Sequence, residues 1–296
     1  MKNPSLTGAA MALAAAVLWG TTGTAQTIAG AQSSPYWIGA LRLAIASAFF
    51  AGLVFFGRSS ESHDHSRLRS AWPWIALGGF AMAAYNLCFF AGVKATGVAT
   101  GTAVAIGSGP VWAGLLQALI SRRPPGPLWW LGTALAVMGI GLMLSGTSSG
   151  TRFDAVGLAF CLAAGLAYAS YTIVSKHLIG ISSPVMATFS VFTMAAVIAV
   201  PVAALTAGTF TASSSSWFMV AYLGLIATGI SYLLFSHALR HVSAATGVTL
   251  AMAEPVTAFV LAIVVVGERP GAAAFGGLAL VIAGLLLVVW LESRRK

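Results

Sequence analysis

The sequence predicts an all-α membrane protein with ten transmembrane helices, arranged as two inverted five-helix repeats. Three observations predict this fold: the composition, the spacing of apolar runs and an internal repeat. Of the 296 residues, 58% are hydrophobic and only 7% are charged, whereas a soluble domain carries roughly 25% charged residues. So few charges cannot cover the surface of a chain this long, and most of that surface must therefore face lipid.

Ten apolar runs are long enough to cross the hydrocarbon core of a bilayer, which takes about 20 residues. The short separators between them are rich in Pro, Gly, Ser or charge, and none leaves room for a soluble domain. The first run follows Lys2 and resembles a signal peptide, but it has a counterpart later in the chain, so we interpret it as a helix. The runs lie near residues 5–28, 36–57, 71–93, 98–120, 128–145, 155–175, 184–206, 216–238, 244–266 and 272–291.

An internal repeat relates the two halves of the chain. In the first part, Gly8, Trp19 and Ser34-Pro35 match Gly157, Tyr168 and Ser183-Pro184 at a constant offset of 149. After the second helix of each half the offset becomes 145 and pairs Gly79 with Gly224, Pro110 with Pro255, Pro125 with Pro270, Gly132 with Gly277 and Gly139 with Gly284. One length change in a loop accounts for the difference. The sequence therefore predicts repeats at residues 1–148 and 149–296, forming one integral-membrane unit.

An odd number of spans in each repeat means that the second repeat enters the membrane upside down relative to the first. Basic residues then indicate the orientation, because short cytoplasmic loops carry an excess of Lys and Arg. One side collects Lys2, Arg58, Arg67, Arg69, Arg122, Arg123, Lys176, Arg240, Arg294, Arg295 and Lys296, whereas the other has Lys94, Arg152 and Arg269. We therefore expect a multi-pass membrane protein with both termini in the cytoplasm.

Two segments at matching repeat positions carry a family resemblance. The stretch from Gly101 through Ser108-Gly109-Pro110 to Arg123 resembles the fourth helix of the EamA-type repeat of the drug/metabolite transporter superfamily. Its counterpart, Glu254-Pro255 followed by Val266-Gly267-Glu268-Arg269, Gly277 and Gly284, resembles the closing hallmark of the same family. Trp19-Gly20 and Arg42 also look like family positions, although Arg123 stands where the second repeat has Glu268.

The resemblance covers essentially the whole chain and is nearest to the bacterial inner-membrane branch that exports aromatic amino acids, which implies a location in the bacterial inner membrane. It implies a secondary transporter that exports aromatic amino acids or similar small amphipathic metabolites by alternating access. Export of other metabolites or drugs, as in other members of the family, stays an alternative. Inverted repeats are common in such transporters, with the substrate site near the membrane midplane between the repeats.

Prolines inside spans four and nine predict a hinge or gate. A proline within a helix removes one donor and frees the carbonyl four residues earlier, here those of Ile106 and Ala251. Such groups are tolerated at membrane depth only inside protein or beside a water-filled cavity. The predicted gating residues are Gly107, Gly109, Pro110 and Pro255. A simple packing kink is the alternative.

Aromatic and polar side chains recur at spacings of three and four residues and predict the lining of a central cavity. Polar tips are costly against lipid, so these residues should turn inward, where they would stack on a ring and bind the charged ends of an amino acid. For each residue the alternative is plain helix packing. The predicted substrate-binding residues are Trp19, Thr22, Met82, Tyr85, Asn86, Phe89, Ser108, Tyr168, Tyr171, Ser175, Tyr232, Phe235, His237 and Glu254.

Three ionisable residues lie in or near the predicted spans. Glu254 is the deepest acid and is the candidate for carrying a proton or meeting an ammonium group. Arg42 lies near the outer end of the second span, where it could extend to the interface or bind a carbonyl. His237 is expected near the cytoplasmic interface. The sequence leaves open whether transport is coupled to protons.

Other functions are disfavoured by the absence of their motifs. No phosphate-binding loop is present, and we expect no cofactor. His63-Asp64-His65 makes a poor closed metal site, and Cys88 and Cys161 offer neither a disulfide framework nor metal-ligand spacing. Basic residues do not cluster as in nucleic-acid-binding proteins.

Two further functional classes stay as alternatives to a carrier. An intramembrane hydrolase would use Ser108 as nucleophile with His237 as its base, and a passive channel would need no gate. We expect no enzyme activity, a small-molecule substrate, the lipid bilayer as surroundings, and a monomer or weak homodimer.

Overall fold

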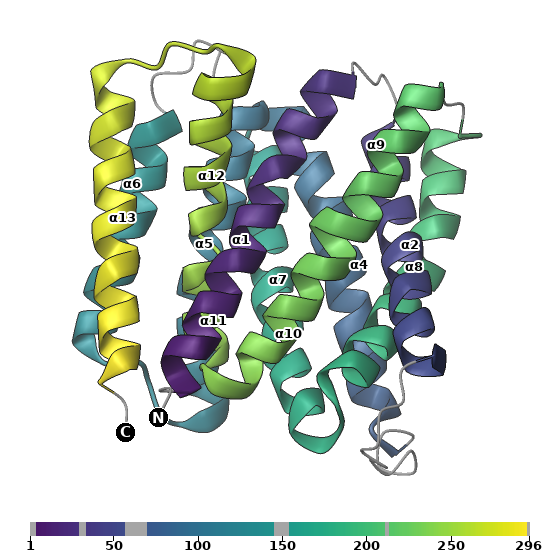
Figure 1. The fold of residues 1–296 in the computed structure, drawn as a ribbon, viewed down its shortest axis with the longest axis horizontal. Coiled ribbons are helices and arrows are strands. Elements are labelled where there is room, and N and C mark those ends of the chain that lie inside the picture. Colours follow the sequence, from purple (N-terminus) through teal and green to yellow (C-terminus); the bar gives the residue numbers. More distant parts are fainter. Residues whose placement is uncertain (1–3, 30–33, 57–69, 145–153, 211–212, 295–296) are drawn as a thin grey trace.

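The computed structural model describes residues 4–29, 34–56, 70–144, 154–210 and 213–294, which form a bundle of helices that run up and down across the molecule (Figure 1). In the described part, nine helical spans are long and apolar enough to cross a membrane, and α6 is an apolar tenth of shorter length. The α-helices are α1 (Pro4–Ala29), α2 (Pro35–Phe56), α4 (Trp72–Thr96), α5 (Val98–Ser121), α6 (Pro127–Leu144), α7 (Ala155–Ile181), α8 (Pro184–Ala207), α9 (Ser214–Gly224), α10 (Ser231–His241), α11 (Ala244–Leu250), α12 (Ala253–Leu261) and α13 (Ala272–Ser293). Two π-helical segments, η1 (Leu225–Ile230) and η2 (Ala262–Val266), complete the eighth and ninth spans. The predicted ten-helix membrane fold is confirmed.

Packing between the helices follows the inverted repeat. The first helix of the first repeat, α1, packs on α10 and α12 of the second repeat. The first helix of the second repeat, α7, packs on the corresponding helices α4 and α5 of the first. The pairs α2–α8 and α6–α13 each join the same position of the two repeats. Gly79 on α4 lies against Met194 of α8, and its repeat partner Gly224 on α9 lies against Ile45 of α2. Duplicated glycines thus serve duplicated contacts.

The α6–α13 pair is held by close backbone approach. A Cβ atom added to Gly139 would lie 2.6 Å from the carbonyl oxygen of Gly277, and one added to Gly132 would lie 3.0 Å from that of Gly284. Small residues allow such contacts, which replace the hydrophobic driving force that is absent between helices in lipid. This pair forms a rigid flank of the bundle, as the glycine pattern of these two helices indicates.

Spans four and nine, whose prolines were predicted to form a hinge, differ from each other and partly from prediction. α5 is one continuous helix with Pro110 inside it, whereas the ninth span is interrupted at residues 251–252, between α11 and α12. The prediction that the carbonyl of Ala251 is free is wrong, because this carbonyl accepts a bond of 2.9 Å from the backbone N–H of Glu254. A tight turn thus takes up the acceptor that Pro255 leaves, so the chain bends without exposing it.

One helix end lies farther along the chain than predicted. The sixth predicted run, residues 155–175, was expected to end before Lys176 and His177, but the corresponding helix α7 continues to Ile181. The ammonium group of Lys176 donates to the backbone carbonyls of Leu239, at 2.6 Å, and Val242, at 2.8 Å. These carbonyls take the place of water, so the helix extends past its charged residue. The predicted repeat boundary between residues 148 and 149 lies outside the described residues.

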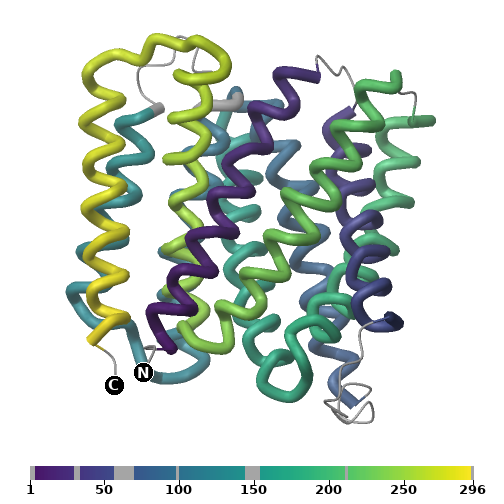
Figure 2. Tube along the Cα trace, in the orientation of Figure 1, coloured from purple at the N-terminus to yellow at the C-terminus, as the bar shows by residue number. Residues whose placement is uncertain are grey.

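The two ends of the bundle differ in openness. Both termini lie at one end, which we call the terminal end, and the opposite end is the distal end (Figure 2). α1 and the α9–η1–α10 span approach each other toward the terminal end and diverge toward the distal end (Figure 2). At the terminal end, Gly8 of α1 lies so close to α10 that an added Cβ would be 2.6 Å from the Cβ of His241. These helices are therefore packed most tightly at the terminal end.

Candidate functional site

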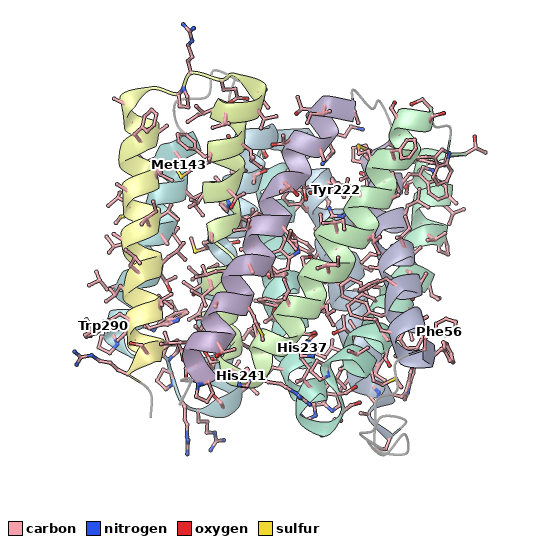
Figure 3. All side chains as sticks on the ribbon, viewed as in Figure 1. Phe56, Met143, Tyr222, His237, His241 and Trp290 are labelled. Atoms are coloured by element: carbon pink, nitrogen blue, oxygen red, sulfur yellow. The ribbon has the colours of Figure 1, made fainter. Side chains whose placement is uncertain are left out.

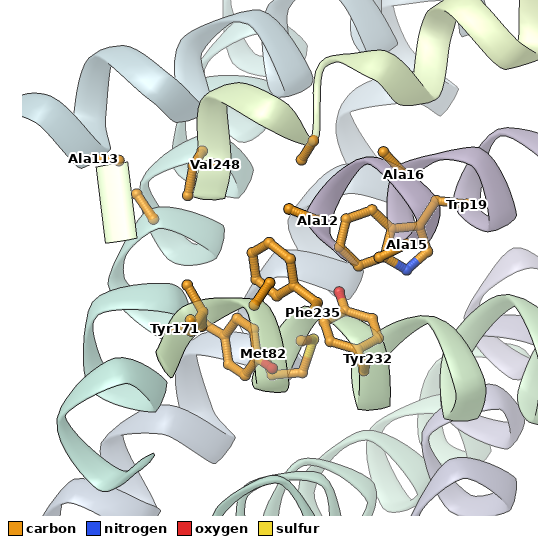
Figure 4. Packing of buried hydrophobic residues seen from close by; sticks show 14 of the residues in the cluster. Ala12, Ala15, Ala16, Trp19, Met82, Ala113, Tyr171, Tyr232, Phe235 and Val248 are labelled. Atoms are coloured by element: carbon orange, nitrogen blue, oxygen red, sulfur yellow. The ribbon is translucent and has the colours of Figure 1, made fainter. Parts of the chain in front are cut away.

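A cluster of aromatic rings occupies the centre of the bundle. Trp19 of α1 points at Tyr232 and Phe235 of α10, with ring centroids 5.0 and 5.2 Å apart (Figure 4). Tyr168 joins them from α7, 6.4 Å from Trp19, and its ring lies 5.3 Å from that of Tyr85 on α4. Further ring contacts complete what we call the aromatic cluster: Trp19, Tyr85, Phe89, Tyr168, Tyr171, Phe192, Tyr232 and Phe235. Rings from both repeats meet here.

Seven of these eight rings belong to the residues that the sequence predicted to bind substrate, and Phe192 does not. Phe192 of α8 is fully buried and lies 4.8 Å from Tyr232 between ring centroids. It was missed because α8 contains no Tyr or Trp to mark an inward face, whereas Phe89 and Phe235 were included because each shares a face with a tyrosine of its own helix. The inward position of the polar aromatics follows from the cost of a phenol or indole nitrogen against lipid.

Two polar atoms inside the aromatic cluster are buried without a partner. In the described part of the chain, neither the indole Nε1 of Trp19 nor the hydroxyl of Tyr168 has a hydrogen-bond partner. Buried polar groups are nearly always satisfied, and leaving one unmade costs about 1–3 kcal/mol. An indole N–H and a phenol O–H are therefore available, among aromatic faces, to a bound molecule that brings its own acceptor.

The other predicted binding residues of α4 lie beside the aromatic cluster, with their polar atoms partly used. Met82 is buried, and its carbonyl accepts a bond of 2.9 Å from the side-chain amide of Asn86. The carbonyl oxygen of that amide faces Gly39 of α2, where an added Cβ would lie 3.5 Å away. Asn86 thus stands between α2 and α4.

Ser108 lies against a neighbouring helix, and Ser175 is buried. Ser108 donates to the carbonyl of Ala105 at 3.3 Å and packs directly on Gly165 of α7. Ser175 is buried one turn after Tyr171. Both serines lie close to residues of the aromatic cluster. Their contacts fit helix packing as well as they fit substrate binding.

His237 and Thr22 stand apart from the ring contacts. His237 lies toward the terminal end (Figure 3), half-buried, with its Nδ1 atom 2.7 Å from the carbonyl of Leu233 on its own helix. Thr22 is half-buried on α1, and its neighbour Thr21 makes the contact between helices instead: it accepts a bond of 2.8 Å from the hydroxyl of Tyr222. The predicted pairing of Ser108 with His237 is not among the contacts of either residue.

Arg42 and Glu254 bring opposite charges to the interior. Arg42 was expected to extend to the interface or to bind a carbonyl, but its Nε donates to the hydroxyl of Thr228, at 3.0 Å. Glu254 lies half-buried in the first turn of α12, beside Gly20 of α1, whose added Cβ would be 2.6 Å from the Glu254 carbonyl oxygen. The charge of Arg42 acts on the carboxyl group of Glu254. Each repeat thus contributes one charge.

A pocket of about 600 Å³ opens at the distal end of the bundle, between α1, α9 and η2. Tyr222, which lies in the distal half (Figure 3), bonds to Thr21 across it. The wall is mostly apolar with a few hydroxyl groups, so it suits an amphipathic molecule. None of the predicted substrate-binding residues lines it. This distal pocket is lined by Thr21, Thr24, Ala25, Ile28, Ala29, Ser215, Phe218, Met219, Tyr222, Leu261 and Val265.

Polar contacts close the terminal end between α7, α10, α11 and α13. Besides the two bonds of Lys176, the hydroxyl of Thr246 donates to a carboxylate oxygen of the buried Glu292, at 2.7 Å. The hydroxyl of Ser243 donates to that of Thr246 at 2.9 Å. The bonds of Lys176 and Glu292 were not predicted, because their partners are 46 to 66 residues away in the sequence.

No group of three or more metal-ligating side chains occurs in the part of the chain that the structure describes. The triplet His63-Asp64-His65 lies outside the described residues.

Comparison with known proteins agrees with this arrangement. The model of the EamA-like transporter family matches residues 6–145 and again residues 155–290. An uncharacterized transporter of Bacillus subtilis, YwfM, is 37% identical over 96% of this chain and 94% of its own length. An uncharacterized transporter of Archaeoglobus fulgidus is 23% identical over 92% of this chain and 94% of its own.

A solved crystal structure superposes with a TM-score of 0.80 at 22% identity, covering 98% of each chain, and so shares the fold. The family match accounts for both halves of the bundle, and it makes the protein a transporter rather than an enzyme. The chain belongs to the EamA-like transporter family, as a multi-pass membrane protein that moves a small molecule.

Proposed function

We propose that this transporter exports aromatic amino acids and similar small amphipathic metabolites by alternating access. The observation that carries the proposal is the aromatic cluster with two unpartnered buried donors, Trp19 Nε1 and the hydroxyl of Tyr168. Aromatic faces favour offset or edge contacts with a further ring, and free donors favour a substrate with acceptor groups. Alanine would bring the carboxylate acceptor but no ring.

The difference between the two ends supports a carrier in its outward-facing state. The terminal end is closed by Gly8 against α10 and by the bonds of Lys176, while the distal end holds the pocket. In our proposal the repeats, residues 1–148 and 149–296, rock about the aromatic cluster so that the pocket closes as the terminal end opens. The interruption beside Pro255 is the main hinge, and Gly107, Gly109 and Pro110 bend less.

The basic residues support an orientation with the terminal end in the cytoplasm. Arg122, Arg240 and Arg294 follow or end helices that finish at the terminal end, whereas Lys94 and Arg269 belong to the distal end. In a bacterial inner membrane this asymmetry favours cytoplasmic termini, and in our proposal the distal pocket opens to the outside. We propose a monomer or weak homodimer as the working unit.

A second candidate, export of other amphipathic metabolites or drugs, is favoured by the distal pocket. Its lining offers apolar surface and hydroxyl groups but no charged side chain, and such a pocket distinguishes poorly among amphipathic molecules. The first candidate requires a substrate with an aromatic ring for the aromatic cluster, and the second does not, so a comparison of substrates separates them.

The test is flux of labelled phenylalanine, tryptophan and alanine through liposomes that contain the purified protein, with and without an imposed pH gradient. Saturable flux of the two aromatic amino acids, with mutual competition and without alanine flux, is the expected result. Protein-free liposomes are the control for leakage. Absence of flux for all three would end the aromatic proposal and leave the broader metabolite candidate. Faster flux under the pH gradient would assign proton coupling, and Glu254 would be its first candidate.

A further inference from the structure

Arg42 is a charged residue at membrane depth whose surroundings are unusually specific. It lies seven residues into α2, which begins at Pro35, and therefore about 10 Å from the helix start at 1.5 Å per residue. Its side chain is half-buried, and the helix around it is apolar. Charged residues at this depth are costly and mark substrate pathways or ion pairs.

The guanidinium group is fixed by a π-helical turn. Its Nε donates to the hydroxyl of Thr228, and that hydroxyl donates in turn to the carbonyl of Leu223, five residues earlier, at 2.7 Å. The Thr228 hydroxyl is thus turned with its lone pairs toward Arg42. Single π-helical turns occur often at functional sites, and here η1 provides a rigid support for one edge of the guanidinium.

The other edge of the guanidinium has no protein partner. Among the described residues, the bond to Thr228 is the one side-chain hydrogen bond of Arg42, and no ion pair is formed with Glu254. An Arg side chain carries five N–H donors in a planar fork that matches a carboxylate. Four of these donors therefore have no protein partner in the described part of the chain, and water or a bound molecule can satisfy them.

Glu254 supplies the opposite charge without closing the pair. Its carboxyl group lies within the electrostatic influence of Arg42, and Tyr85 of the aromatic cluster lies within that of both. Its backbone adjoins Gly20, the residue after Trp19. One cation and one acid that do not touch, beside aromatic rings, match a molecule that carries an anion, a cation and a ring together.

We propose that Arg42, positioned by Thr228, binds the substrate carboxylate and that Glu254 receives its ammonium group, so that the site selects zwitterionic amino acids over amines and acids. This rests on the proposed function and names the chemical feature that it recognises. Arg42 becomes a specificity-determining residue in the substrate site, and Thr228 becomes its positioning residue.

The experiment measures competition against labelled tryptophan in proteoliposomes. Tryptamine lacks the carboxylate and indole-3-propionate lacks the ammonium group, while both keep the ring. For the wild-type protein we expect each to compete at least roughly tenfold more weakly than unlabelled tryptophan, the effect of one lost hydrogen-bonded charge.

Arg42→Gln should lower tryptophan affinity by at least about tenfold and remove the preference for tryptophan over tryptamine. Arg42→Lys keeps the charge but not the fork and should recover part of the affinity. Thr228→Val keeps the guanidinium group but removes the hydroxyl that positions it, and it should raise the KM for tryptophan by several-fold. Arg123→Gln, an exposed charge in the α5–α6 loop, is the matched control and should behave as wild type. Melting temperature and direct binding of labelled tryptophan in detergent verify that each variant is folded.

Equal competition by tryptophan and tryptamine in the wild type, or unchanged tryptophan affinity in a folded Arg42→Gln, would overturn the charge-pair site while leaving aromatic export intact. Failure of the wild type to carry or bind tryptophan and phenylalanine would overturn both proposals.

Discussion

The α6–α13 pair and the aromatic cluster are both packed interiors, but they are filled differently. In the pair, backbone meets backbone: an added Cβ on Gly139 would lie 2.6 Å from the Gly277 carbonyl oxygen. In the cluster, rings meet at centroid distances of about 5–6 Å, and Trp19 and Tyr168 keep unpartnered polar atoms. The pair is held by close backbone contact, whereas the cluster places its two unpartnered donors among rings of both repeats, where a further molecule can bind. Substitutions should therefore affect stability in the first region and transport in the second.

The largest effect is expected in the α6–α13 pair. Gly139→Leu forces a side chain into the backbone of α13, and overpacking of this kind costs about 1–3 kcal/mol or more. We expect little folded protein, measured by size-exclusion chromatography and thermal melting in detergent.

Gly141→Leu is the matched control for that substitution. It lies on the same helix, but an added Cβ there would meet no atom within 4 Å. A Gly139→Leu protein as stable as Gly141→Leu would contradict the view of this pair as a rigid flank.

Tyr168→Phe should affect substrate binding and not stability. Its hydroxyl has no protein partner among the described residues, so its removal should leave the melting temperature unchanged or raise it. If the hydroxyl binds substrate, tryptophan affinity should fall by roughly two- to tenfold, the range for one neutral hydrogen bond. Flux and binding measurements check this, and a destabilised protein with wild-type affinity would assign the hydroxyl to structure.

Tyr222→Phe sharpens the comparison, because this tyrosine hydroxyl does have a partner. It donates to Thr21 at 2.8 Å and ties α9 to α1 at the distal pocket. Its loss should cost about 1 kcal/mol of stability, seen as a lower melting temperature than that of Tyr168→Phe. Equal melting temperatures for the two variants would remove the distinction between satisfied and unsatisfied tyrosines.

The fold was predictable because its signals are local or repeated. Apolar runs set the spans, and the matched positions of Gly132 with Gly277 and Gly139 with Gly284 indicated which helices correspond. Because α6 and α13 occupy the same position in the two repeats, the glycines of each helix lie against the backbone of the other. Helix ends such as that of α7 were less predictable, since Lys176 is satisfied by carbonyls more than 60 residues away.

The candidate site was predictable only in part. Polar aromatics such as Trp19 and Tyr168 could be assigned to the interior because lipid excludes their polar atoms. The bond between Arg42 and Thr228 could not, because it depends on the π-helical turn η1, for which a single sequence carries no clear signal. Pro110 and Pro255 likewise share one pattern in sequence, yet α5 is continuous and the ninth span is interrupted, so the proline pattern alone did not distinguish the two.

The smallest effect is expected for Ser108→Ala. The hydroxyl of Ser108 donates to Ala105 within its own helix, at 3.3 Å, and lies against Gly165 of α7. Such a bond to the preceding turn contributes little to helix stability, so flux, binding and melting temperature should all stay near wild type. Affinity lowered as strongly as in Tyr168→Phe would instead place Ser108 in the substrate site, and the border of the aromatic cluster would then extend across α5. The two variants measured side by side therefore fix where packing ends and binding begins.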